Sequence, residues 1–171
     1  CMMIALLSIF LSRETPDEFY NRDTGMFNEN GFLKMIDENI HTREEFHLVL
    51  FTISNVVQIR EKAGVDGMNL CLKQISAKIH QMYHHNCYAL DDNELVFFAG
   101  SKRAAQANAA YMNEWLSQPL KMNGQEIHIE TEMTAWDITK KIGQSAQDIL
   151  FEIESYFTNV LAKFIYMDHF T

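Results

Sequence analysis

The sequence predicts a single α/β domain in which a central mixed sheet is flanked by helices. A nearly continuous run of apolar β-formers at residues 47–53 is typical of a strand that is covered on both faces. Segments with helical and strand-like spacing alternate in the order helix, strand, helix, helix, hairpin, helix, strand, helix. The length of 171 residues fits roughly one domain of ~150 residues, and no Gly/Ser linker or internal repeat divides it.

Residues 1–17 are predicted to form an N-terminal linker helix that leads from an upstream region into a domain at 18–171. No basic residue precedes the apolar run at 1–11, and no small-residue cleavage site follows it, so a signal peptide is not expected. The run is also shorter than the ~20 residues that span a bilayer. We expect it to pack on this domain, on a second copy or on an upstream sensor region; the alternative is the end of a membrane span.

The first elements of the domain are short. Thr15 followed by Pro16 predicts a helical turn, because Pro fits the first helical position. Asn28 is a suitable N-cap for a helix through about Asn39, which is expected to bury Phe32, Leu33 and Ile36. The strand at 47–53 should then lie in the centre of the sheet.

A long helical region follows this strand. A helix that begins at Asn55 is expected to break at Gly64, and a longer helix follows. The buried face of that second helix is predicted to comprise Met68, Cys71, Leu72, Ile75, Ile79 and Met82. Strands at 87–90 and 94–99 form a predicted hairpin around the polar turn at 91–93.

The last third is predicted to contain a helix, a hairpin turn, a strand and a long helix. Ser101 caps a helix whose inward stripe is Ala105, Ala109, Met112 and Leu116. The dipeptide at 123–124 is a two-residue hairpin signal, and the alternation over 127–133 predicts one strand with a wet face. Ser145 and Asp148 resemble a capping box. The helix that they begin should extend past the domain body and bury Ile149, Leu150, Ile153, Phe157, Val160, Leu161 and Phe164.

Composition excludes several classes of protein. With 14 Lys and Arg against 23 Asp and Glu, the formal net charge is −9, which disfavours nucleic-acid binding because such a surface repels phosphate. A hydrophobic content of 47% with two Pro and seven Gly argues against disorder. Three widely spaced cysteines are typical of a reduced compartment, so we expect a cytoplasmic protein or the cytoplasmic part of a membrane-anchored one.

A small cluster of histidines is a weak candidate for a zinc site. His80 and His84 have helical spacing, and His85 and Cys87 follow them; this spacing resembles that of zinc ligands. Because the chain is expected to pass from helix to strand here, the side chains should diverge, and a polar helix end is the favoured interpretation.

Several motifs resemble those of GGDEF domains, the diguanylate cyclases, between about residue 18 and residue 158. The segment 21–28 with the residues 31–33 after it is similar to the family's D-x-L-T-G-L-x-N-R-x-x-F motif, and 56–59 stands where the family has F-K-x-I. Gly64 matches the glycine of N-D-x-x-G-H, and Leu72 the leucine of G-D-x-x-L. The hairpin Asp91-Asp92-Asn93-Glu94-Leu95 stands at the position of G-G-D/E-E-F, and 146–154 at that of A-D-x-A-L-Y-x-A-K.

The resemblance implies a ferredoxin-like nucleotidyl cyclase palm that joins two GTP molecules into cyclic di-GMP across a two-fold dimer. This chemistry uses two metal ions, which prefer carboxylate ligands. It also uses the two hairpin glycines, because they let the backbone approach the nucleotide.

At the metal and hairpin positions the chain departs from the family pattern. Thr52 stands in place of the first metal carboxylate and Asn93 in place of the second, so no metal is expected. Asp91 and Asp92 replace the glycines and add negative charge. Glu94 alone keeps the family identity, as a vestige or a weak ligand, and 91–93 is also an ordinary turn composition.

The nucleotide-pocket equivalents are Asn28, Arg60, Asn69, Leu72 and Glu154. Arg60 replaces the guanine-reading asparagine, Asn69 the guanine-reading aspartate, and Glu154 the phosphate-binding lysine. No Lys or Arg occurs between Lys78 and Lys102, so the arginine-based product-inhibition motif has no counterpart.

We therefore expect no catalytic residues and no cofactor, and a non-catalytic regulatory or dimerisation module of a larger cyclic di-GMP signalling protein. Its expected partner is a second copy or a neighbouring domain such as a phosphodiesterase. Two alternatives stay open: a weak or divergent cyclase that uses Mg²⁺ and GTP, and a domain that binds a nucleotide as an effector.

Overall fold

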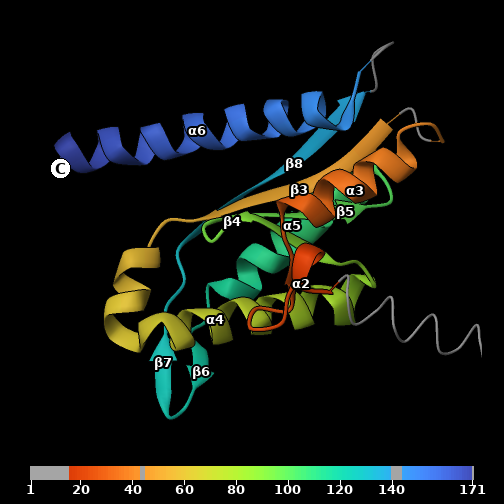
Figure 1. The fold of residues 1–171 in the computed structure, drawn as a ribbon. Helices are drawn as coiled ribbons and strands as arrows, with labels where there is room; N and C mark the ends of the chain where they lie inside the picture. The colour runs from red at the N-terminus through yellow and green to blue at the C-terminus, as the bar shows by residue number, and fades with distance from the viewer. Residues whose placement is uncertain (1–15, 43–44, 140–143, 171) are drawn as a thin grey trace, which may run out of the picture.

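The computed structural model describes residues 16–42, 45–139 and 144–170, and their arrangement is an α/β fold with a mixed sheet between two layers of helices (Figure 1). The predicted linker helix over residues 1–17 lies mostly outside the described residues. Within the described part, α2 (Pro16–Phe19) is the short helical turn that Pro16 predicts. No helix in the described part of the chain is both long and apolar enough to cross a bilayer.

The main sheet has six strands in the order β1-β2-β4-β5-β3-β8. These strands are β1 (Tyr20–Asn21), β2 (Met26–Phe27), β3 (Glu45–Ile53), β4 (Cys87–Asp91), β5 (Glu94–Ala99) and β8 (Thr131–Thr139). The pair β2 and β4 is parallel and the other pairs are antiparallel, so the predicted mixed sheet is confirmed. A separate hairpin consists of β6 (Leu120–Met122) and β7 (Gln125–Ile127).

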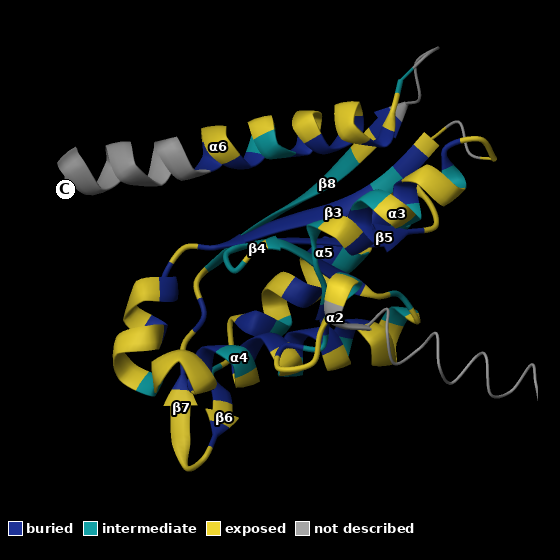
Figure 2. Cartoon of the chain, in the orientation of Figure 1, coloured by how far each residue is buried: buried dark blue, intermediate teal, exposed yellow. Residues whose placement is uncertain are grey.

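Strand β3 lies inside the sheet, between β5 and β8, as the apolar run predicts. Its side chains alternate between two cores. Leu48 and Leu50 pack with α3 (Glu29–Asn39) and α6 (Ala146–Phe170), whereas Val49 and Phe51 pack with α4 (Val56–Tyr83) and α5 (Lys102–Leu116). Figure 2 shows the strand buried along nearly its whole length. Both faces are covered, which explains why no polar alternation marks this strand.

Helices α3 and α4 follow the sequence closely, with two corrections. The Asn28 side chain accepts a hydrogen bond from the Gly31 N–H and caps α3, and Gly64 interrupts α4 with φ +76°. Only glycine adopts that conformation readily. Met82 is 41% exposed rather than buried, because α4 ends at Tyr83 beyond the core. Leu33 is partly buried and packs at the edge of the core.

The predicted strand over 127–133 is wrong, since two strands occupy this region. β7 ends at Ile127 and β8 begins at Thr131. Between the two strands, the backbone forms hydrogen bonds with the Asn55 side chain instead of with a neighbouring strand. The Asn55 amide donates to the His128 carbonyl over 2.9 Å and accepts from the Glu130 N–H over 2.9 Å. The chain thereby leaves the small hairpin and joins β3.

The capping box that begins α6 is confirmed. The Ser145 N–H donates to the Asp148 carboxylate over 2.9 Å, and the Asp148 N–H donates to the Ser145 hydroxyl over 3.3 Å. The Ser145 N–H and the Ser145 hydroxyl both donate to the Asp148 carboxylate, which holds the pKa of Asp148 below its ordinary value. Five of the predicted inward residues are buried, namely Ile149, Leu150, Ile153, Phe157 and Val160. The side chains of Leu161 and Phe164 are outside the described part.

Candidate functional site

The site lies at the end of β3, where β5 begins. Thr52 pairs with Glu94 in the antiparallel register, and the Ile53 N–H donates to the Asn93 carbonyl over 3.1 Å. The two positions at which the resemblance implies metal ligands, Thr52 and Asn93, are thus brought together. The turn before Glu94 also has ordinary turn chemistry, because the Asp92 N–H donates to the Asp91 carboxylate over 2.8 Å.

The groups at this point do not fit a divalent cation. The Thr52 side chain is 1% exposed, and its hydroxyl has no hydrogen-bond partner among the described residues. Mg²⁺ is held in proteins by carboxylates and water, whereas Thr52 offers a neutral hydroxyl and Asn93 a neutral amide. In the part of the chain that the structure covers, no three His, Cys, Asp or Glu side chains come together as metal ligands.

Four carboxylates near the hairpin turn influence one another electrostatically, and we call Glu29, Asp91, Glu94 and Glu154 the acidic group. Burial and, after it, the charges of Asp91, Glu154 and Glu29 together raise the pKa of Glu94 to about 7. Burial and the charge of Glu29 raise the pKa of Glu154 as well. A cation in contact with these side chains would lower the pKa values. Among the residues that the structure describes, no Lys, Arg or His forms an ion pair with the acidic group. The acidic group is therefore uncompensated within that part of the chain, and it would repel the phosphates of a nucleotide.

A cavity of about 220 Å³ lies beside the hairpin. Three of the five nucleotide-pocket equivalents line it, namely Asn28, Asn69 and Leu72. Asn69 and Leu72 of α4 line it together with Asp91 and Asp92. Asn28 lines it too, but its side chain is occupied, since it caps α3 and donates to the Glu18 carbonyl over 2.7 Å. Glu94, Glu154 and Thr52 do not line the cavity. The predicted site residues therefore divide between the cavity and the acidic group, and Asp91 belongs to both.

Arg60 forms an ion pair with Asp92 of the hairpin turn. Both side chains are about 40% exposed, so the contact contributes little to stability. It does decide where the guanidinium points, because the arginine is held at the turn. Sequence reasoning missed this pair, and the opposite charges of two neighbouring elements were the only signal that could have indicated it.

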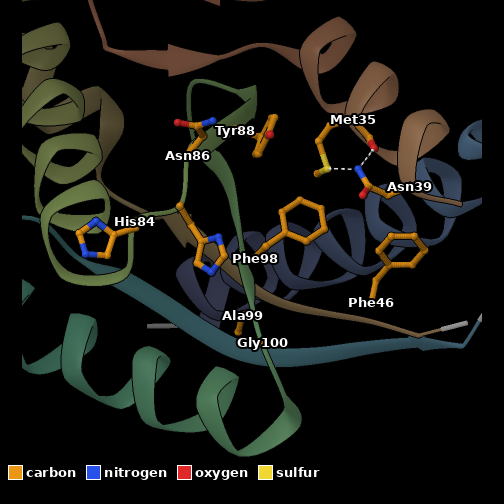
Figure 3. A pocket seen from close by; sticks show the side chains of 10 residues that line it. Met35, Asn39, Phe46, His84, Asn86, Tyr88, Phe98, Ala99 and Gly100 are labelled. Carbon is orange, nitrogen blue, oxygen red and sulfur yellow. Dashed lines mark hydrogen bonds between the residues drawn. The ribbon is translucent and has the colours of Figure 1, made fainter. Parts of the chain in front are cut away.

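The four residues of the zinc candidate do not form one ligand set: the rings of His80 and His84 meet, with centroids 6.5 Å apart, but Cys87 lies in the core. His80 lines a cavity on α4, whereas His84 and His85 line a different cavity of about 310 Å³. Figure 3 shows His84 on one side of that second cavity, with Phe46, Phe98, Met35 and Asn39 across from it. Cys87 is 1% exposed and belongs to the core, and burial raises the pKa of its thiol far above the ordinary value. The polar helix end is the interpretation that this arrangement supports.

Comparisons with solved structures agree with this architecture. The GGDEF domain of FimX from Pseudomonas aeruginosa matches with a TM-score of 0.69 at 16% identity, over 84% of this chain and 93% of that one. A diguanylate cyclase/phosphodiesterase from Caldicellulosiruptor saccharolyticus matches with a TM-score of 0.61 at 16% identity, over 70% of this chain and 76% of that one.

A third structure, the GGDEF domain of DgcB from Caulobacter crescentus in complex with c-di-GMP, matches with a TM-score of 0.61 at 13% identity, over 81% of this chain and 84% of that one. No protein-family model and no curated protein matches the sequence. The strand order, the helices on both faces and these matches together show that the chain has the fold of the GGDEF domains, a nucleotidyl cyclase palm.

Proposed function

We propose that this chain is a non-catalytic GGDEF-like module that regulates or dimerises a larger cyclic di-GMP signalling protein. The observation that carries the proposal is the uncompensated acidic group. A cyclase needs cations where the triphosphate lies, and this chain has Glu154 at the position of the phosphate-binding lysine, close to Glu29 and Glu94. Thr52 and Asn93 supply no carboxylate to hold a metal ion there.

The proposed role within a larger protein rests on two of the solved structures that share this fold. The DgcB domain was solved with c-di-GMP, and the Caldicellulosiruptor protein is described as both cyclase and phosphodiesterase. We therefore place the chain beside a second copy of itself or a phosphodiesterase domain, whose activity it would modulate through its surfaces. Nucleic acid is not a proposed partner, because the net charge is −9.

The test of this proposal is a cyclase assay with purified protein, GTP and either Mg²⁺ or Mn²⁺. We expect no cyclic di-GMP above a heat-denatured control in chromatography, while a GGDEF domain with an intact hairpin motif gives product under the same conditions. Product that disappears in the Glu94→Ala variant would contradict the proposal and support a divergent cyclase.

A nucleotide effector is the second candidate, and the 220 Å³ cavity beside Asn69 and Leu72 favours it. Asp91 and Asp92 line this cavity, so we expect GTP and cyclic di-GMP to bind very weakly. The Asp92→Asn variant removes a negative charge and releases Arg60, and it should bind GTP more tightly than the wild type in calorimetry. Saturable binding to the wild type at micromolar nucleotide, lost in Arg60→Ala, would establish the effector role instead.

A further inference from the structure

A further cavity lies between α4 and the segment that joins β1 to β2. It also measures about 310 Å³, but it is not the cavity that His84 and His85 line. Tyr20 and Gly25 line it from that segment, Lys73, Ser76 and His80 line it from α4, and Asn86 closes one end. Its size falls within the range of small-molecule sites. It shares no lining residue with the cavity beside the hairpin, so it is independent of the proposed function.

The spacing of the α4 residues explains how they reach one cavity. Lys73, Ser76 and His80 are three and four residues apart, so they lie on one face of the helix. The Ser76 hydroxyl donates to the Gly25 carbonyl over 2.6 Å. This bond holds the β1–β2 segment against α4 and fixes the width of the cavity.

Three hydrogen-bond donors of the lining are available to a ligand. Among the residues that the structure covers, none forms a hydrogen bond or ion pair with the Tyr20 hydroxyl or the Lys73 ammonium, and the His80 ring meets only the ring of His84. The Tyr20 oxygen lies close to Gly25, 3.8 Å from the position of a Cβ there. These donors come from two elements and converge on one space.

No carboxylate lines this cavity, although the chain has 23 acidic against 14 basic residues. An ammonium with neutral donors and no acid is a suitable environment for an anion. The next cavity along α4, about 280 Å³ in volume, shares Lys73 and is lined by Asp23, Asp66 and Arg22. An extended anion would meet two carboxylates and one guanidinium there, and this net negative charge favours a compact anion.

We propose that the cavity between α4 and the β1–β2 segment binds a small oxyanion, a phosphate group or a carboxylate, through Lys73, Tyr20 and His80. The ammonium supplies the charge, and the phenol and imidazole supply directed hydrogen bonds. Asp66 sets the limit on ligand length from the neighbouring cavity.

The test is an NMR titration of the ¹⁵N-labelled protein with inorganic phosphate and, separately, with succinate. Saturable shifts at the amides of Gly25, Ser76 and Ala77 are expected with at least one anion, and the responding anion distinguishes a phosphate site from a carboxylate site. Lys73→Gln should weaken binding about tenfold, as expected for the loss of a charge-assisted bond, and Tyr20→Phe about threefold. Asp66→Asn should tighten it.

Lys102→Gln is the matched control, because it removes an equal charge from an exposed lysine whose ion-pair partner, Asp137, does not line the cavity. Its affinity should equal that of the wild type. Equal weakening by Lys102→Gln and Lys73→Gln would overturn the proposal, since it indicates attraction by charge alone. Absence of saturable shifts with both anions would also overturn it. All four substituted side chains lie on exposed or half-buried positions, and circular dichroism would confirm that each variant is folded.

Discussion

At the scale of single residues, the buried hydroxyl of Thr52 has no partner among the described side chains and backbone, and an unpaired buried polar group lowers stability. Thr52→Val replaces the hydroxyl with a methyl group of similar shape. We expect the free energy of unfolding to rise by about 1 kcal/mol, measured by urea denaturation at pH 7.

Thr24→Val is the matched control for that variant. Thr24 is also buried, but its hydroxyl accepts a hydrogen bond from the Met26 N–H over 3.3 Å. Its loss leaves that N–H unpaired, so the free energy of unfolding should fall by about 1 kcal/mol. If Thr52→Val destabilised the protein as Thr24→Val does, the Thr52 hydroxyl would have a hydrogen-bond partner, and its loss would not be stabilising.

Glu94 makes stability depend on pH. Its pKa rises from 4.5 to about 7 on folding, so between these values the unfolded chain has lost a proton that the folded chain still holds. Stability therefore falls as pH rises through this window. Because Glu94 is partly solvated, the loss should be about 1 to 2 kcal/mol rather than the full value of the shift.

The Glu94→Gln variant tests this dependence by chemical denaturation at pH 5 and pH 8. The variant should be more stable than the wild type at pH 8 and should lose the decline between the two pH values. Glu61→Gln, on an exposed part of α4, controls for the change in net charge. An unchanged pH dependence in Glu94→Gln would assign the decline to other groups.

Single-residue contacts were predictable where helix capping or strand pairing determines them, as in the Asn28 cap of α3. The meeting of Thr52 with Asn93 follows from a hairpin that pairs with the central strand, and both were readable from the apolar spacing. The pair between Arg60 and Asp92 depends on how far two exposed side chains reach. The spacing of residues along the sequence does not predict this reach.

At the scale of the elements, Gly31 lets α3 approach the preceding segment. A Cβ at this position would lie 2.8 Å from the Phe19 carbonyl oxygen and 3.1 Å from the Phe27 Cβ. Backbone cannot yield as a flexible side chain does, so α3 must move away. Gly31→Ala should lower the free energy of unfolding by about 2 kcal/mol.

Gly100→Ala is the control for that variant, because no atom lies within 4 Å of a Cβ there. Thermal unfolding of the two variants should show a clear loss for Gly31→Ala and a change within about 0.5 kcal/mol for Gly100→Ala. Equal melting temperatures would show that α3 is not held by this contact.

The elements that sequence reasoning missed are those fixed by partners distant in sequence. β1 and β2 have two residues each, too few for any periodicity, and they exist because β2 pairs with β4. The break between β7 and β8 depends on the Asn55 amide, more than 70 residues away. The long helices and the central strand were predictable because their patterns are local.

At the scale of the whole molecule, the chain has the fold of the GGDEF domains. Under the proposed function, its difference from a cyclase therefore lies in side chains rather than in architecture. Restoring the family residues on this scaffold should therefore restore affinity for a nucleotide. The restored variant carries Thr52→Asp, Asp91→Gly, Asp92→Gly, Asn93→Asp and Glu154→Lys.

We expect this five-fold variant to bind GTP saturably with Mg²⁺ in calorimetry. It should also gain thermal stability on addition of the two, because a ligand that binds only the folded state raises the melting temperature. Thr52→Asp alone should lower stability by about 3 kcal/mol or more, since it buries an unpaired charge, and it should bind no GTP. The control replaces Glu154→Lys with Glu152→Lys, at the exposed neighbouring position of α6. The two variants have the same net charge and differ only in the position of the lysine. Binding by both would show that a lysine at position 154 is not required, whereas binding by the first alone would show that the charge at position 154 decides affinity.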